Sequence, residues 1–300
     1  MSISEIQSHI EAAEKNYTLY EARNFDKRVE VLDFLGFHVL EQIDEFIHKT
    51  AKPENLILLR QRAENVKSGL EKIDITLFQK LQMKIQKGSL KRSVFKNLAQ
   101  EFAGIKSVSR DNLEAPGYDN LDILTNGLFP IQTIPEPTKD LETEMVPYQK
   151  TPARIVFELA EKCGFRKTDV FFDLGAGLGQ VAILINLLTG IKSKGVEFEP
   201  AFCNYASACA ATLNLNDVTF INADVRNADY SGGTIFFMYS PFKGGMLREV
   251  LSILKNRSSK RKIKIFTYGP CTVQVASEHW LDFEDPKNDN IYRLGVFYSR

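Results

Sequence analysis

The apolar residues change their period about half-way along this chain, and this change constrains the fold more than any other feature. Before residue 110 they recur every three or four positions, which is the period of an amphipathic helix. After residue 150, short runs rich in β-branched and aromatic residues alternate with helical segments; the runs are 169–174, 194–198, 218–221, 234–239 and 263–268. Such alternation predicts an α/β domain with a mostly parallel sheet covered by helices on both faces.

Further elements are expected around these strands. Helical segments are predicted near 178–190, 200–213 and 245–256, and two last strand-like runs at 280–283 and 291–298 flank a turn-rich stretch. These runs predict a closing antiparallel hairpin. The first 110 residues are expected to form a bundle of three or four helices. Their apolar spacing resembles heptads, so a homodimer through these N-terminal helices stays open beside simple packing within the chain.

The two regions are joined by a segment of different composition. Residues 111–150 carry 8 acidic and 2 basic side chains, and they hold 5 of the 11 prolines. Proline fixes φ and removes a backbone donor, which disfavours regular structure. We therefore predict a helical bundle domain over 1–110, an acidic, proline-containing linker over 111–145 and an α/β domain over 146–300.

Composition narrows the classes of function. The 38 Lys and Arg residues balance the 38 Asp and Glu residues, so no overall charge attracts the chain to nucleic acid or to an anionic membrane. The sequence contains no apolar stretch of transmembrane length and no signal-peptide pattern, which favours a cytoplasmic protein with no membrane partner. The four cysteines form no C-x-x-C pair, so we expect reduced thiols and no metal site.

The strongest local motif is a glycine-rich loop where the run 169–174 turns into a helical segment. Gly175, Gly177 and Gly179 let a ligand approach the backbone closely and leave N–H groups free at a helix start. A dinucleotide-binding loop would place its third glycine at the position of Gln180, and Asp173 would repel a pyrophosphate. The loop therefore favours a ligand with an ammonium group over a nicotinamide dinucleotide.

The pattern Asp-x-Gly-x-Gly-x-Gly after a first strand resembles motif I of class I S-adenosylmethionine-dependent methyltransferases, which implies a Rossmann-like seven-stranded sheet and S-adenosylmethionine as cofactor. The resemblance implies that Glu197 accepts from the two ribose hydroxyls, which a carboxylate can do at once. It also implies that Phe198 packs on the adenine and that Asp224, followed by Val225, accepts from the adenine amino group.

The end of the fourth predicted strand carries Tyr239, Ser240, Pro241 and Phe242. In the family this point faces the transferable methyl group, so these four residues are the candidate catalytic residues. Amine-methylating members often have Asn/Asp-Pro-Pro-Tyr/Phe there, and this chain departs from that pattern with a serine and a single proline. A strand end followed by a proline turn explains the same residues equally well.

Upstream, Pro147-Tyr148-Gln149-Lys150-Thr151-Pro152 is similar to a segment of protein-lysine methyltransferases, including the Dot1-like group, where it covers the methionine end of the cofactor. Tyr148 and Thr151 are therefore candidate cofactor residues. Thr151 and Pro152 also suit the N-cap and first position of an ordinary helix.

The methyl acceptor is the least determined partner. We expect nitrogen methylation of a lysine-like protein acceptor, because the resemblance favours protein over nucleic acid. Two basic clusters, at 80–110 and 255–264, could hold RNA, but few aromatic residues interleave with them for base stacking. A nucleic-acid or small-molecule methyltransferase and an inactive cofactor-binding scaffold stay open as alternatives, and Gln180 and Asp173 argue against a dehydrogenase.

Overall fold

A computed structural model describes residues 1–90, 92–102, 118–131, 133–285 and 290–300. These residues divide into two compact units: the first contains 1–83, 97–102 and 119–128, and the second contains 84–90, 92–96, 118 and the described residues from 129 onward. Lys91, Lys106 and Arg110 of the first basic cluster lie outside the described residues, as does most of the turn-rich stretch before the last strand.

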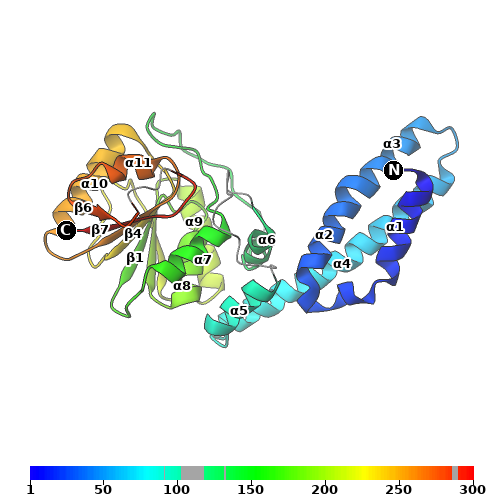
Figure 1. Ribbon diagram of the computed structural model, residues 1–300, viewed down its shortest axis with the longest axis horizontal. Coiled ribbons are helices and arrows are strands. Elements are labelled where there is room, and N and C mark those ends of the chain that lie inside the picture. The colour runs from blue at the N-terminus through cyan, green and yellow to red at the C-terminus, as the bar shows by residue number, and fades with distance from the viewer. Residues whose placement is uncertain (91, 103–117, 132, 286–289) are drawn as a thin grey trace. The chain divides into compact units, whose positions relative to one another are not determined.

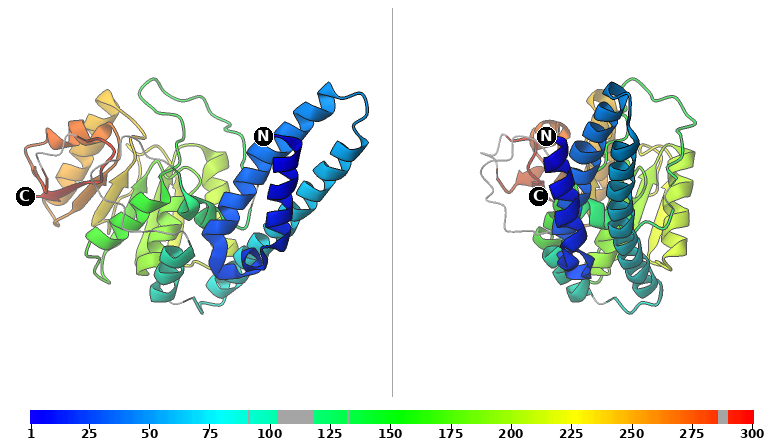
Figure 2. Two further views of the ribbon diagram at one scale, coloured as in Figure 1. Left: turned by 45° about the vertical axis from the view of Figure 1, so that its right-hand side comes forward. Right: turned by 90° about the vertical axis from the view of Figure 1, so that its right-hand side faces the viewer.

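The first unit is helical, as its apolar period predicts. Helix α1 (Ile3–Lys15) begins with a capping box between Ser2 and Glu5. The chain then stays helical from Phe25 to Lys49 and returns along α4 (Glu54–Gln86), so that the helices lie side by side in both views of Figure 2. Their shared core is apolar; it includes Ile6, Ile10, Leu35, Val39, Ile43, Ala63 and Leu70.

The second unit contains the predicted sheet, which has seven strands in the order β3-β2-β1-β4-β5-β7-β6. The strands are β1 (Val170–Leu174), β2 (Lys192–Glu197), β3 (Val218–Asn222), β4 (Ile235–Met238), β5 (Lys264–Thr267), β6 (Leu281–Phe283) and β7 (Gly295–Ser299). The first five run parallel, and β7 pairs antiparallel with both β5 and β6. The predicted mostly parallel sheet with a C-terminal antiparallel hairpin is confirmed.

Helices cover both faces of this sheet, as Figure 1 shows. On one face α8 (Gln180–Thr189) packs on β1 and β2, α9 (Pro200–Thr212) packs on β2 and β3, and α7 (Ala153–Lys162) packs on α8. On the other face α10 (Gly244–Ser258) and α11 (Cys271–Ala276) share a core with the apolar side chains of β1, β4 and β5. Both faces of the strands are buried, which explains why β4 reads as the continuous apolar run Ile-Phe-Phe-Met.

Two local features differ from the expectation. The proline-containing segment includes a short helix, α6 (Asn120–Gly127), whose N-cap Asp119 forms a capping box with Asp122. The helix before the glycine loop begins one residue later than predicted, since Pro152 rather than Thr151 is the N-cap of α7. The difference arises because Pro152 has an extended ψ of 133°, so it stands outside the helix. No helix in the described part of the chain is long and apolar enough to cross a membrane.

Candidate active site

A cavity of about 300 Å³ lies at the carboxyl ends of β1, β2 and β4. This is the edge at which open α/β sheets bind their ligands, because loops after neighbouring strands diverge there. The walls come from the glycine loop, from the ends of β2 and β4, and from residues 137–146, which we call the strap.

The glycine loop fits closely against two other parts of the wall. Gly175 has φ +82°, and a Cβ there would lie 2.4 Å from the Cβ of Pro241. Gly177 has φ +51°, and a Cβ there would lie 2.3 Å from the ring of Tyr148. Side chains are excluded at both positions by conformation and by contact. Gly179 lies outside the cavity, at the N-cap of α8 and against Ala206 and Phe220.

Two buried carboxylates lie in the cavity wall. Asp173, at 3% exposure, has no hydrogen-bond donor among the described residues, and burial together with the charge of Glu197 raises its pKa well above the ordinary value. Burial also raises the pKa of Glu197, and hydrogen bonds from the amides of Glu199 and Gly177 partly offset this. Those amides donate to different oxygens of Glu197, at 2.8 and 2.6 Å. The carboxylate of Glu197 also lines the cavity, where a ligand hydroxyl can donate to it.

This pair of acids selects the charge of a ligand. An ionised carboxylate without a partner is costly when buried, so a cation that enters the cavity removes that cost at Asp173. S-adenosylmethionine carries an ammonium and a sulfonium group, and its ribose offers two hydroxyl donors for Glu197. The cofactor expected from the glycine loop thus fits the residues present.

The end of β4 forms the wall beside Gly175. Ser240 has φ +42°, a left-handed conformation that is strained for serine. Its hydroxyl donates to the carbonyl of Tyr268 at 3.2 Å and accepts from the amide of Cys271 at 2.9 Å. The hydroxyl is thus engaged with the loop after β5. The ring of Tyr239, whose centroid lies 4.8 Å from that of Tyr268, makes this part of the wall aromatic.

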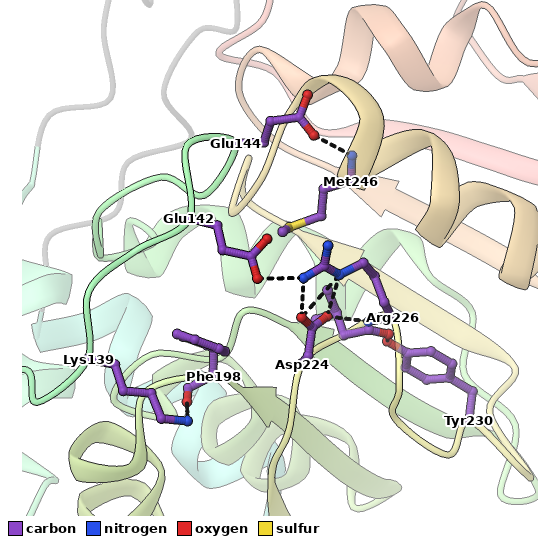
Figure 3. Close-up of polar contacts among 9 residues, drawn as sticks. Lys139, Glu142, Glu144, Phe198, Asp224, Arg226, Tyr230 and Met246 are labelled. Atoms are coloured by element: carbon purple, nitrogen blue, oxygen red, sulfur yellow. Dashed lines mark hydrogen bonds and ion pairs between the residues drawn. The ribbon is translucent and has the colours of Figure 1, made fainter.

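The strap is held at its ends by acids that satisfy backbone donors. Glu199, the N-cap of α9, accepts from the Thr138 hydroxyl at 2.6 Å and from the Lys139 amide at 2.8 Å. Burial opposes ionisation there, but these hydrogen bonds outweigh it and lower the pKa of Glu199 to about 2. At the other end Glu144 accepts from the amides of Gly245 and Met246, both at 2.7 Å, and thereby caps α10 (Figure 3).

Asp224 lies beside the cavity and is absent from its lining. The guanidinium of Arg226 donates to both carboxylate oxygens, and it also pairs with Glu142 of the strap at 2.7 Å (Figure 3). The hydrogen bonds from Arg226 lower the pKa of Asp224. Contact between Asp224 and adenine stays a prediction, and the structure gives this carboxylate a protein partner instead.

The structure brings together most of the residues selected from sequence. Twelve of them line the cavity: Tyr148, Thr151, Asp173, Gly175, Gly177, Glu197, Phe198, Val225, Tyr239, Ser240, Pro241 and Phe242. Sequence reasoning missed the strap, from which Lys139, Leu141 and Met145 reach the lining, and it missed Gln180 and Phe202. The Lys139 ammonium lies 4.4 Å from the centroid of the Phe198 ring. The alternating acids Glu142 and Glu144 indicate an extended segment, but the sequence does not identify their partners.

Replacing Glu197 by glutamine should weaken S-adenosylhomocysteine binding at least about tenfold, because it removes a charged acceptor of ribose hydroxyls. In Glu197→Gln the side-chain amide nitrogen would also face one of the backbone N–H groups that donate to the carboxylate in the parent. Isothermal titration calorimetry measures the affinity. Asp217→Asn, the same chemical change at an exposed residue before β3, is the control. Equal affinities for Glu197→Gln and the parent would reject the assignment of Glu197.

Comparisons with known proteins give one family model that covers part of this site and several solved structures of low identity. The family model "Histone methylation protein DOT1" matches residues 143–231, which include the glycine loop, Glu197 and Asp224. No curated protein sequence matches the chain. A solved RNA methyltransferase from Salinibacter ruber in complex with S-adenosyl-L-homocysteine is 20% identical, covering 50% of this chain and 92% of that chain, with a TM-score of 0.40.

Two further solved structures match the chain with similar identity, coverage and TM-score. A precorrin-6y C5,15-methyltransferase from Geobacter metallireducens is 16% identical over 52% of this chain and 92% of its own, with a TM-score of 0.39. An S-adenosylmethionine-dependent methyltransferase from Aquifex aeolicus is 16% identical over 49% of this chain and 93% of its own, with a TM-score of 0.38. Likeness at this level says nothing about the acceptor. With the DOT1 match and the seven-stranded sheet in place, the chain is a methyltransferase whose residues 143–231 resemble the Dot1-like group of class I S-adenosylmethionine-dependent methyltransferases.

Proposed function

We propose that this enzyme methylates a nitrogen of a protein, on a lysine-like side chain. The match of residues 143–231 to the DOT1 family model is the observation that carries this proposal. The matched residues run from the strap through the glycine loop to the segment between β3 and β4, so they contain most of the residues that line the cavity.

In this proposal the cofactor lies along the carboxyl edge of the sheet. Asp173 binds the ammonium of the methionine end, Glu197 accepts from the ribose hydroxyls, and Phe198 and Val225 pack on the adenine. Tyr148 covers the methionine end above Gly177, which explains why the ring and the glycine are in contact.

The acceptor end of the cavity is the wall formed by Tyr239, Ser240, Pro241 and Phe242. When bound, the cofactor would supply a methyl group on a positively charged sulfur, and transfer to a neutral amine would break the sulfur–methyl bond, form the nitrogen–methyl bond and move the positive charge to the nitrogen. The residues therefore need mainly to orient a neutral amine in line with the methyl carbon and to exclude water. Phe242 is buried, and Tyr239 packs against Tyr268, so this wall can exclude water.

The basic clusters give little support to a nucleic-acid acceptor. Lys255 and Arg257 lie in the last turn of α10 and Lys264 begins β5, at the sheet edge opposite the cavity. Arg257 donates to the Gly233 carbonyl and Lys264 to the Cys163 carbonyl, so both have structural partners. In the described part of the first cluster, Lys96 pairs with Glu161 at 2.8 Å.

The test is transfer of a labelled methyl group from S-adenosylmethionine to proteins and nucleic acids of a fractionated lysate. We expect label in a protein fraction that survives nuclease, with methyl-lysine recovered after acid hydrolysis. Label that disappears after nuclease treatment would overturn the proposal of a protein acceptor. Label found in small molecules would overturn it as well. The variant Asp173→Asn serves as the control for transfer that depends on this site.

A further inference from the structure

The strap is held by hydrogen bonds, by backbone pairing of residues 144–146 with residues 241–243 and by one ion pair, and the ion pair differs in kind from the other contacts. The hydrogen bonds include those from backbone amides to Glu199 and from the α10 N-terminus to Glu144. The ion-pair anchor joins Glu142 and Arg226. Their side chains are 49% and 27% exposed, so added salt can screen this ion pair.

Arg226 donates to both carboxylate oxygens of Asp224. Its amide donates to Oδ1 at 2.7 Å, and its Nε donates to Oδ1 and Oδ2 at 3.0 and 3.1 Å. The terminal nitrogen Nη2 donates to Oδ2 and, at 2.7 Å, to Glu142. A carboxylate offers about four lone-pair sites, and three N–H groups of Arg226 occupy most of those of Asp224.

The neighbours of these residues connect the anchor to the cavity. Leu141 lies next to Glu142 and lines the cavity, and Val225 lies between Asp224 and Arg226 and lines it too. The carbonyl of Val225 accepts from the Tyr230 hydroxyl, which fixes the backbone at this point (Figure 3). We therefore expect a change at the anchor to move the cavity-lining side chains of Leu141 and Val225.

We propose that Arg226 is a positioning residue for the cofactor, which joins Asp224 to Glu142 and so holds the strap over the adenine end. Asp224 then acts on the cofactor through Arg226 and the strap rather than by accepting from the adenine amino group. The proposal rests on the proposed function only in that the cavity binds S-adenosylmethionine and its product.

The experiment measures binding of S-adenosylhomocysteine and of S-inosylhomocysteine, in which an oxygen replaces the adenine amino group. Glu142→Gln should weaken binding of both about threefold, as expected for an exposed ion pair. Arg226→Gln and Asp224→Asn should weaken binding of both about tenfold, since they also break the hydrogen bonds between residues 224 and 226. Asp140→Asn is the control, because Asp140 is an exposed acid of the strap with no recorded partner among the described residues.

Two further measurements separate positioning from simple loss of structure. Added salt should weaken binding to the parent and to Asp140→Asn but leave Glu142→Gln almost unaffected. The KM for the cofactor should rise in Glu142→Gln while kcat at saturating cofactor stays close to that of the parent. A similar loss of kcat and of thermal stability in that variant would indicate damage to the fold and overturn the positioning role.

The two nucleosides decide between the alternatives for Asp224. If Asp224→Asn weakens only the compound that carries the amino group, Asp224 contacts adenine directly and the proposal is wrong. If Arg226→Gln binds more tightly than the parent, Arg226 competes with adenine for Asp224, which also overturns it. A parent protein that binds neither nucleoside would instead overturn the proposed function.

Discussion

Replacing Asp173 by asparagine is expected to weaken S-adenosylmethionine binding by roughly 30- to 100-fold. The carboxylate is buried, lacks a hydrogen-bond donor among the described residues and lies in the cavity wall, so its ion pair with the cofactor ammonium is worth about 2–3 kcal/mol. The asparagine has the same shape but no charge. Calorimetric titration of the two proteins measures the difference.

The pH dependence of binding follows from the raised pKa of Asp173 in the empty site. The ammonium binds the ionised form, so affinity is complete above that raised pKa and falls as the pH is lowered through it. In Asp173→Asn this part of the pH dependence should vanish. A variant with the affinity and pH profile of the parent would show that the ammonium binds elsewhere.

The same pKa shift fixes the sign of the effect on stability. Because the folded-state pKa is raised, ionisation of Asp173 destabilises the empty fold, and this loss grows as the pH rises from the unfolded pKa to the folded pKa. We therefore expect empty Asp173→Asn to melt no lower than the parent at neutral pH. A lower melting temperature would mean that the carboxylate stabilises the empty protein, contrary to its lack of donors.

Replacing Phe95 by alanine should lower the free energy of unfolding of the second unit by about 3–5 kcal/mol. Phe95, in α5 (Arg92–Phe102), is 1% exposed, and its ring centroid lies 6.0 Å from that of Phe157 in α7. Urea denaturation, monitored through the loss of S-adenosylhomocysteine binding, measures the change in the free energy of unfolding. Val94→Ala, at a neighbouring residue that is 42% exposed, should change it by no more than about 0.5 kcal/mol.

Truncation of the chain removes further contacts that the early helices make within the second unit. Residues 84–90 and 92–96 belong to the second unit, and the side chain and carbonyl of Gln86 form hydrogen bonds with Thr212 and Asn214. A fragment that begins at residue 140 loses these contacts and the Thr138 anchor of the strap, so we expect it to be less stable than the same unit in the whole chain. If Phe95→Ala were no more destabilising than Val94→Ala, this account of the early helices would fail.

Local patterns in the sequence determined the strands, the helices that follow them and the glycine loop. Strand and helix periods follow from backbone geometry over a few residues, so runs such as 169–174 and 234–239 could be recognised without a partner. Asp173 is selected by its place just before the glycine loop and Glu197 by the resemblance to the methyltransferase motif; Glu197 ends β2, Asp173 lies next to the end of β1, and these adjacent parallel strands end at one edge. For the same reason the cavity could be predicted at that edge.

The acidic segment shows that local sequence patterns do not reveal the partners of a side chain. Its prolines and net charge predicted a linker, but the strap 137–146 lines the cavity and binds residues 60 to 100 positions away, such as Glu199 and Gly245. The same composition suits a solvated linker and a strap whose acids cap helices, because composition does not say which donors lie nearby. Only the folded sheet brings the N-termini of α9 and α10 and the Arg226 guanidinium to the same rim.

Asp224 and Phe95 depended on tertiary structure in the same way. Asp224 stands near the expected strand end and pairs locally with Arg226, but tertiary structure brings Glu142, 84 positions away, to the same guanidinium. Phe95 belongs to an amphipathic helix in the sequence, and the period alone does not say which apolar surface the helix meets. The sequence by itself thus determined the elements and the edge where the site lies, since those depend on backbone period. Tertiary structure alone decided the partners of individual side chains, since those depend on contacts between residues distant along the chain.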